Sequence, residues 1–308
     1  MSKPLVSIIM NCYNGEKFLK ETLESVYAQT YTNWEVIFWD NLSTDNSKQI
    51  ACSFDDKIKY YRGEFFLPLG AARNMAISKA QGEFIAILDC DDLWYPSKLL
   101  KQISVFIEFP EIDLVYSNYT IINEDGVLES NNTNLKIGHI CNAFKPIFLH
   151  ELTIPWPTIV MKKDIVINVG GFSNYKSAED FDLLLKISQK SQFYFVDEFL
   201  ATYRIHINQL STNFELTKNE IFQIYNYWEV TWSEYDDLDA KKNEWLKIGK
   251  KQICYISGLR ALIQNKSAST FFKEAIKYKG NIKLYILYFI SYIPIITFII
   301  RKYYFAKK

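Results

Sequence analysis

Three carboxylates follow a single apolar segment of the chain: residues 89–92 read Asp-Cys-Asp-Asp, directly after the apolar run 84–88. An uninterrupted apolar run is typical of a strand that is covered on both faces, and open α/β sheets bind ligands where such strands end. Carboxylates packed without a counter-charge would repel one another, so the pattern favours a divalent cation, Mn²⁺ or Mg²⁺, shared with substrate phosphates. Either of the last two acids could instead cap the helix that we expect to begin near residues 96–97.

The chain around this motif alternates strand and helix patterns over residues 5–122, at a spacing typical of parallel βαβ units. Helix patterns cover about 18–27 and 70–80, where apolar residues recur at helical intervals. The expected strands are 5–10, 34–39, 58–61, 84–88 and 114–118. This order predicts a nucleotide-binding α/β sheet. The sequence contains neither Gly-x-Gly-x-x-Gly nor Gly-x-x-x-x-Gly-Lys, which argues against dehydrogenases and P-loop proteins.

Residues 123–210 are less periodic, and segments of this kind usually carry specificity. The expected elements are a polar loop at 131–134, an extended turn at 155–157, a break at Gly170-Gly171, a helix at 178–188 and short strands at 193–196 and 201–205. After about residue 215 the pattern becomes helical.

Length and composition predict one large folded domain with an appendage: the chain has 308 residues, of which 49% are hydrophobic. The formal net charge is zero, and we expect no nucleic-acid partner. Five cysteines without a Cys-x-x-Cys spacing fit a reducing, cytoplasmic environment. The apolar run at 5–10 is too short for the core of a signal peptide, so we expect no export.

The C-terminal segment differs from the rest in charge: from residue 273 onward it carries eight Lys or Arg and one acidic residue. Within it, residues 284–300 contain no charge and are interrupted by Pro294. Seventeen residues make a helix of roughly 25 Å, marginal for a membrane span. The basic flanks and nearby tyrosines are better suited to a broken helix pair lying in an anionic membrane interface. The alternative is a core helix or a dimer contact; as a core helix it would bury Ile286 and Phe289.

Further motifs occur in a fixed order along the first two thirds of the chain. They are VSIIMNCYN at 6–14, VIFWDNLSTD at 36–45, ARN at 72–74, LDCDD at 88–92, GGF at 170–172 with AEDFDL at 178–183, and YRIH at 203–206. Together they resemble the motifs of the family 2 glycosyltransferases with the GT-A fold, over about residues 4–212. That family usually has Asp-Asp-Gly-Ser where this chain has Asp40-Asn41-Leu42-Ser43.

The resemblance implies a fold and a reaction. The fold would be α/β: a Rossmann-like GT-A domain of the nucleotide-diphospho-sugar transferase type over 1–212, with a donor half at about 1–122 and an acceptor half at about 123–212. A helical extension at 213–280 and the basic, apolar segment at 281–308 would follow. The reaction would be inverting transfer of one sugar, a hexose or N-acetylhexosamine with the glucose type favoured, from a UDP-sugar to a glycan hydroxyl. The acceptor would be a growing, polyprenyl-linked cell-surface glycan at the inner face of the cytoplasmic membrane.

The resemblance also implies the roles of individual residues. The UDP-sugar donor is expected to contact Asn11, Tyr13, Asn14, Asp40, Asn41, Arg73, Asp89, Cys90 and Arg204. Asp91 is expected to bind the metal, with Asp89 and His206. Asp180 is the expected catalytic base, with Glu179 beside it to tune or orient. Trp156 and Asp92 are expected at the acceptor.

The chemistry of sugar transfer agrees with these roles. A leaving nucleoside diphosphate needs its developing charge neutralised, which a metal held by Asp91 would do as a Lewis acid. The acceptor hydroxyl must lose a proton, which Asp180 at the start of a helix could accept. Three alternatives remain open: a helix N-terminus that merely favours acids such as Asp180, a surface arginine at Arg73, and a core tryptophan at Trp156.

Two other functions are weighed against this one. A nucleotidyltransferase would share the sheet and the carboxylates, but it should have a Gly- and Lys/Arg-rich loop after its first strand, where this chain reads Asn-Cys-Tyr-Asn-Gly at 11–15. A non-catalytic sugar-binding module would tolerate the loss of Asp91 or Asp180, and the chain has both.

Overall fold

The computed structural model describes residues 3–124, 128–131, 143–206, 213–234, 239–264 and 266–292. The chain divides into two compact units, one of residues 1–145 and 152–209 and the other of residues 146–151 and 210–308. Most of the predicted polar loop at 131–134 lies outside the described residues, and so does the end of the uncharged segment, with Pro294 and Ile296.

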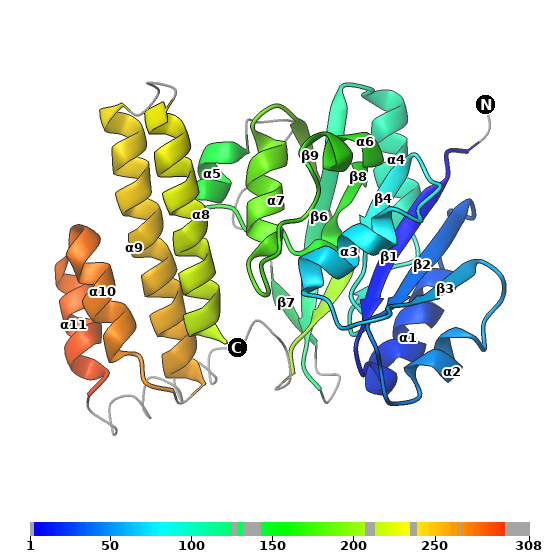
Figure 1. Cartoon of the computed structure of the whole chain (residues 1–308), viewed down its shortest axis with the longest axis horizontal. Coiled ribbons are helices and arrows are strands. Elements are labelled where there is room, and N and C mark those ends of the chain that lie inside the picture. Colours follow the sequence, from blue (N-terminus) through cyan, green and yellow to red (C-terminus); the bar gives the residue numbers. More distant parts are fainter. Residues whose placement is uncertain are drawn as a thin grey trace. The chain divides into compact units, whose positions relative to one another are not determined.

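Four parallel strands form one part of the sheet in the first unit (Figure 1). β1 (Val6–Cys12) pairs with β2 (Trp34–Asp40) and β4 (Phe84–Ile87), and β3 (Ile58–Arg62) pairs with β2. Every residue of β1, β2 and β4 is buried, as expected for strands covered on both faces. These four predicted strands are confirmed, with ends that differ by at most two residues. Because the strands are parallel, the segments that follow β1, β2 and β4 leave the sheet at the same edge.

The other strands run in mixed directions. They are β5 (Leu93–Trp94), β6 (Ile112–Ile122), β7 (Leu128–Asn131), β8 (Val160–Lys162) and β9 (Gln192–Arg204), in the sheet order β3-β2-β1-β4-β8-β6-β9-β5, with β7 on β6. β6 covers the predicted strand 114–118 and runs in the same direction as β4, as expected. It does not pair with β4, because β8 comes from later in the chain and inserts antiparallel between the two. The two short strands expected after residue 192 form one strand, β9, whose pairing with β6 shifts register near Ser117.

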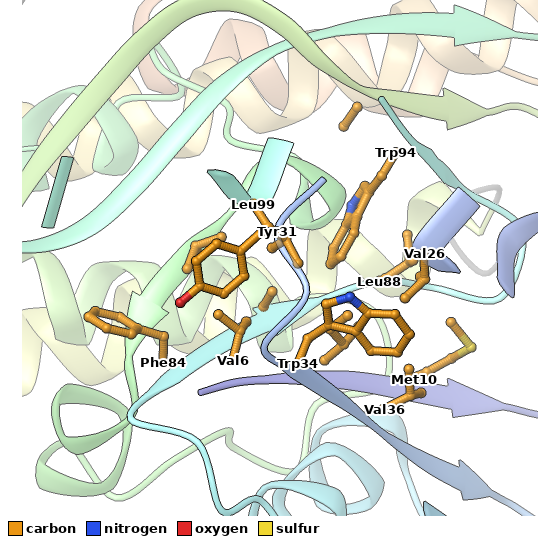
Figure 2. Packing of buried hydrophobic residues seen from close by; sticks show 14 of the residues in the cluster. Val6, Met10, Val26, Tyr31, Trp34, Val36, Phe84, Leu88, Trp94 and Leu99 are labelled. Atoms are coloured by element: carbon orange, nitrogen blue, oxygen red, sulfur yellow. The ribbon is translucent and has the colours of Figure 1, made fainter. Parts of the chain in front are cut away.

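One large core cluster lies between the sheet and the helices α1 (Glu16–Tyr27) and α4 (Lys98–Glu108). α1 buries Leu19, Leu23 and Val26, and α4 buries Leu99 and Ile103, at the spacing of one helix face. Val6, Ile8 and Met10 of β1 join the same cluster, because alternate side chains of a strand point to the same face. Figure 2 shows Val6, Met10, Leu88 and Leu99 in this cluster, together with Trp34 and Trp94. The short helix α2 (Ser47–Ala51) packs beside α1.

Helix α3 (Leu69–Ile77) packs on β1 and β2 and contacts α7 (Glu179–Ser188), which also contacts α6 (Lys163–Asn168). Asn74 of α3 binds the backbone of Phe172 twice: its Nδ2 donates to the carbonyl at 2.8 Å, and the Phe172 N–H donates to Oδ1 at 2.9 Å. Gly171 has φ +72°, and a Cβ there would lie 2.6 Å from Asn74 Oδ1. Only glycine suits that conformation and that space. The Gly-Gly-Phe segment is thus tied to α3 shortly before α7 begins. The turn expected at 155–157 is a 3₁₀ helix, η1 (Trp156–Thr158).

The second unit is helical in the part that the structure describes. Its helices are α8 (Phe214–Glu234), α9 (Ala240–Ile263), α10 (Ser269–Lys279) and α11 (Ile282–Ile290), and it includes the end of α5 (Phe144–Phe148). α9 packs against α8 and α10, and α10 packs against α11 (Figure 1). Leu284 of α11 is buried in the core cluster of this unit, whereas Ile286 and Phe289 are exposed. A core helix would have buried both.

Two neighbouring leucines of α4 test this account of the core. Leu99 is 0% exposed and Leu100 is 46% exposed. We expect Leu99→Ala to lower the free energy of unfolding by about 2–5 kcal/mol, because it removes buried methyl groups and leaves a cavity. Leu100→Ala should change it by about 0.5 kcal/mol or less. Urea denaturation of the two variants makes the comparison, and equal losses would contradict the packing described here.

Candidate active site

The acidic motif lies at the edge of the sheet where the parallel strands end. The Leu88 N–H donates to the Ile9 carbonyl at 3.1 Å, which extends the pairing of β4 with β1 by one step before the chain turns through residues 89–92. β2 ends at Asp40 at the same edge. The predicted donor residues of three strands therefore lie along one border of the sheet.

Arg73 connects this border to α7. Its guanidinium is 1% exposed, and it donates from Nη2 to Asp89 Oδ1 at 2.7 Å and from Nη1 to Glu179 Oε1 at 2.6 Å. The same group lies 5.5 Å from the ring centroids of both Trp156 and Phe172. Such placement gives cation–π attraction in addition to the two ion pairs. The alternative of a surface arginine is therefore wrong, because this side chain is enclosed.

The charges around Arg73 are unbalanced, since one cation faces the carboxylates of Asp89, Glu179 and Asp180. Burial raises the pKa of Glu179 to about 7, against the opposing influence of Arg73. Burial also raises the pKa of Asp180, and the charge of Asp89 contributes in the same direction. A carboxylate with a raised pKa is a stronger base, which suits proton abstraction. Asp180 is partly exposed, and its Oδ1 accepts from the Phe181 N–H at 2.6 Å.

Asp91 and His206 meet although they are far apart in the sequence. His206 Nε2 lies 2.8 Å from Asp91 Oδ2, and the His206 ring packs 5.3 Å from that of Phe18. Arg204 supports the same turn, because its Nε donates to the Asp91 carbonyl at 2.8 Å and its Nη2 to Glu21 Oε2 at 2.7 Å. Arg204 is itself buried. The contact between Arg204 and the donor stays a prediction.

Asp92 has a different environment from its neighbours. Its side chain is buried, its Oδ1 accepts from the Arg204 N–H at 2.9 Å, and burial raises its pKa well above the ordinary value. The expected contact of Asp92 with the acceptor stays a prediction, and it would require this carboxyl to be uncovered. The side chain instead connects the end of β9 to the acidic turn.

Two of these side chains suit a divalent metal. Asp91 and His206 offer an oxygen and a nitrogen at one point, and they are 21% and 14% exposed; Mn²⁺ accepts both donor types. Asp89 has one oxygen engaged by Arg73. No group of three or more His, Cys, Asp or Glu side chains arranged to bind a metal occurs within the described ranges. Two protein ligands fit a Mg²⁺ or Mn²⁺ ion whose remaining ligands are phosphate oxygens and water.

Asp40 is enclosed by two partners that the sequence analysis did not identify. Tyr60 Oη and Arg62 Nη1 each donate to Asp40 Oδ2 at 2.6 Å, and the Ser43 N–H donates to Oδ1 at 2.7 Å. The Asp40 side chain is 0% exposed, whereas that of Arg62 is 41% exposed. A uracil N–H could reach Asp40 only after Arg62 or Tyr60 moves. Both partners lie on β3, next to β2 in the sheet. Their position near the end of the third predicted strand was the signal that could have placed them beside Asp40.

The other predicted donor residues lie around the ends of β1 and β2. Tyr13 is 54% exposed, and its ring meets that of Phe66 edge-on at 5.0 Å. Asn41 holds the backbone of Leu67 through two hydrogen bonds, at 2.9 and 3.1 Å. The side-chain amide of Asn11 is buried and has no hydrogen-bond partner among the described residues. A buried polar group of this kind is commonly satisfied by a ligand or water.

The turn after β2 keeps a left-handed conformation without glycine. Leu42, which occupies the usual glycine position of the family motif, has φ +68°. Asn14 has φ +54°, and its Oδ1 accepts from the Thr44 N–H at 2.8 Å. A leucine at positive φ is uncommon and costs roughly 1–2 kcal/mol.

Trp156 is 6% exposed and packs against Arg73 and Phe172. This burial agrees with the alternative of a core tryptophan, and stacking on an acceptor sugar would require the ring to be uncovered. Its Nε1 and Glu179 Oε2 are buried without a partner among the described residues. Phe66 and Glu21 were also missed by the sequence analysis, because their roles come from contacts between distant segments. Asn74 was part of a quoted motif, but its contact with Phe172 was not predicted.

Comparison with known proteins agrees with this geometry. Residues 7–167 match the sequence profile described as Glycosyl transferase family 2. An uncharacterized glycosyltransferase of Rickettsia typhi is 32% identical, over 75% of this chain and 71% of its own length. The UDP-Glc:alpha-D-GlcNAc-diphosphoundecaprenol beta-1,3-glucosyltransferase WfgD of Escherichia coli is 31% identical, over 75% of this chain and 86% of its own length.

Solved structures share the fold. S. aureus TarS 1-349 in complex with UDP-GlcNAc superposes with a TM-score of 0.68 at 20% identity, over 89% of this chain and 81% of that one. The mannosyltransferase PcManGT of Pyrobaculum calidifontis, in complex with GDP-Man and Mn²⁺, gives a TM-score of 0.59 at 14% identity, over 98% and 88%. The profile match, the relatives and the shared architecture lead to one conclusion: the chain is a glycosyltransferase of family 2 with the GT-A fold.

Proposed function

We propose that this glycosyltransferase is metal-dependent and inverting, and that it moves one sugar from a UDP-sugar to a hydroxyl of a lipid-linked glycan. The observation that carries the proposal is the buried Arg73, which binds Asp89 of the donor edge and Glu179 of α7 together. It fixes the helix of the proposed base, Asp180, relative to the proposed metal ligands. A sugar-binding module without catalysis would have no need of this coupling.

On the donor side, Asp91 and His206 would hold the metal, with Asp89 nearby. A bound Mn²⁺ or Mg²⁺ would neutralise the charge that develops on the leaving diphosphate. Arg204 keeps the Asp91 turn in place through the Asp91 carbonyl, and it anchors that turn to α1 through Glu21. Tyr13 and Phe66 offer exposed aromatic faces for the base, beside the buried amide of Asn11.

On the acceptor side, Asp180 would accept the proton of the attacking hydroxyl. The acceptor oxygen forms a bond to the anomeric carbon on the face opposite the diphosphate, while the bond from that carbon to the diphosphate oxygen breaks. The electron pair of the broken bond leaves with UDP, and the proton ends on Asp180. The raised pKa of Asp180 favours this transfer. Glu179, held by Arg73, keeps the first turn of α7 in position.

The identity of the sugar and acceptor rests on similarity. The relative WfgD is by its name a glucosyltransferase that uses UDP-Glc and a diphosphoundecaprenol-linked GlcNAc. This supports a glucose-type donor and a polyprenyl-linked acceptor in a cell-surface glycan for this chain as well. A lipid-linked acceptor requires an enzyme that works at a membrane surface, and we propose the cytoplasmic face.

α11 supplies a surface for such an association. Ile282, Tyr285, Ile286 and Phe289 are 48–80% exposed and recur at the spacing of one helix face, and Tyr292, in the turn that follows, is 60% exposed. Three lysines are exposed nearby: Lys273 and Lys277 on α10, and Lys283 on α11 itself. An apolar stripe with basic neighbours is typical of helices that lie in an anionic interface. Among the described residues, no helix has both the length and the hydrophobicity of a membrane span.

Two substitutions separate the metal ligand from the base. Asp91→Asn should abolish metal-dependent binding of UDP, whereas Asp180→Asn should leave the affinity for UDP nearly unchanged and lower turnover about 10²- to 10⁴-fold, the usual contribution of a positioned base. Isothermal titration with UDP and Mn²⁺ measures binding, and release of UDP from a panel of UDP-sugars measures turnover. Asp113→Asn, in a surface ion pair with Lys162, is the matched control.

Equal loss of UDP affinity in Asp91→Asn and Asp180→Asn would contradict the assigned roles. Full activity in Asp180→Asn would contradict the role of Asp180 as the catalytic base. Release of pyrophosphate from a nucleoside triphosphate and a sugar phosphate would favour a nucleotidyltransferase, and UDP-sugar binding without any UDP release would favour a sugar-binding module.

A single charge on α11 tests the membrane surface. Ile286→Glu should weaken binding to anionic vesicles roughly tenfold or more, because burial of an isoleucine side chain contributes about 1.5–3 kcal/mol. Ile107→Glu places the same change on α4, where Ile107 is 66% exposed, and should have no effect. Vesicle co-sedimentation measures both. Equal binding of the two variants, or no binding by the unaltered chain, would contradict the role of α11.

A further inference from the structure

Two cysteines of the first unit lie on neighbouring segments: Cys12 is the last residue of β1, and Cys90 lies in the turn that follows β4. β1 and β4 are parallel, with Ile9 opposite Ile87, and the ladder continues to Leu88. Beyond Leu88 the chain turns away from this ladder, and Cys90 follows two residues later. The evidence that the two cysteines can pair is therefore the position of their sulfur atoms.

The two sulfur atoms also point to the same place. A Cβ added to Gly15 would lie 2.7 Å from Cys90 Sγ and 2.8 Å from Cys12 Sγ. Both sulfur atoms therefore lie within 2.8 Å of one point. The absence of a side chain at residue 15 thus leaves the space in which both sulfurs sit. Both cysteines are free thiols in this structure.

We propose that Cys12 and Cys90 form a reversible disulfide that switches the donor site off under oxidising conditions. The proposal rests on the donor-binding role proposed above for residues 89–91. Hydrogen peroxide is the oxidant: it converts one of the two thiols to a sulfenic acid and releases one water. The other thiol then attacks that sulfur, the S–S bond forms, and a second water leaves. Two thiols are oxidised and one peroxide is reduced to two waters, so atoms and electrons balance.

The disulfide would act through the residues on either side of Cys90. Asp89 reaches Arg73, and Asp91 reaches His206. A bond from Cys90 to the end of β1 would fix the turn between these two carboxylates and prevent the adjustment that a metal and a diphosphate require. Disulfides in a reducing compartment are usually transient and redox-sensing, which fits two neighbouring free thiols.

The full chain is treated with hydrogen peroxide, and disulfides are mapped by mass spectrometry of non-reduced peptides. UDP binding with Mn²⁺ is measured before oxidation, after oxidation and after reduction with dithiothreitol. We expect a link between the peptides of Cys12 and Cys90. We also expect the affinity for UDP to fall roughly tenfold or more, as when the surroundings of a metal ligand are disturbed, and to recover on reduction. Cys12→Ser should keep its UDP affinity through the same treatment. Cys52→Ser, which removes an exposed lone thiol, should behave like the unaltered chain.

Cys12→Ala serves as the second variant if the serine does not fold. Persistence of both thiols under peroxide, further oxidation of Cys90 without a link to Cys12, or pairing of either residue with Cys52 or Cys141 would overturn the proposal. A disulfide that forms without changing the affinity for UDP would contradict the claim that it switches the donor site off. If no form of the protein binds UDP, the proposed function fails, and the peptide map still reports the disulfide.

Discussion

The ion pairs of Arg73 impose a constraint on which the site depends. A buried guanidinium is costly unless its charge is compensated, and removal of one partner of a buried pair typically costs about 3–5 kcal/mol. Asp89 and Glu179 supply that compensation from opposite sides, and Trp156 and Phe172 enclose the group. Because Asp89 follows β4 and Glu179 begins α7, satisfying this single charge also brings the donor edge to the helix of Asp180. The positions of the proposed metal ligands and of the proposed base are therefore not independent.

The rest of the site is arranged around this constraint. Asn74, the neighbour of Arg73, binds the backbone of Phe172 through two hydrogen bonds. α3 is therefore connected to α7 by the ion pair of Arg73 with Glu179, and to the segment before α7 by Asn74. Arg204 and His206 reach the same acidic turn from the end of β9. Among the carboxylates near Arg73, Glu179 and Asp180 have pKa values raised by burial. An excess of negative charge near the proposed metal ligands fits the proposal that the site becomes balanced when a metal binds.

The sequence predicted the parts of the fold that follow from local pattern. Buried apolar runs identified β1, β2 and β4, and the motif order identified Asp89, Asp91, Asp180 and His206 as candidates. It did not predict β8, three residues whose pairing is decided by the sheet around them, nor the continuity of β9. Glu21 was missed because an ion pair between distant segments leaves no local pattern, whereas Arg62 was missed although it lies at the end of a predicted strand. The motif did not reveal that Asp92 is buried while Asp91 is accessible, because burial depends on the segments that fold over the turn.

A double-substitution cycle on Asp89 and Glu179 tests most directly the claim that Arg73 couples the two halves of the site. Unfolding by urea, in the presence of a chelator, gives the free energy for Asp89→Asn, Glu179→Gln and the double variant. Each single change leaves Arg73 one carboxylate, and the double change leaves it with neither. We predict that the double variant loses more stability than the sum of the single losses, by about 1–3 kcal/mol. Additivity within about 0.5 kcal/mol would contradict the coupling.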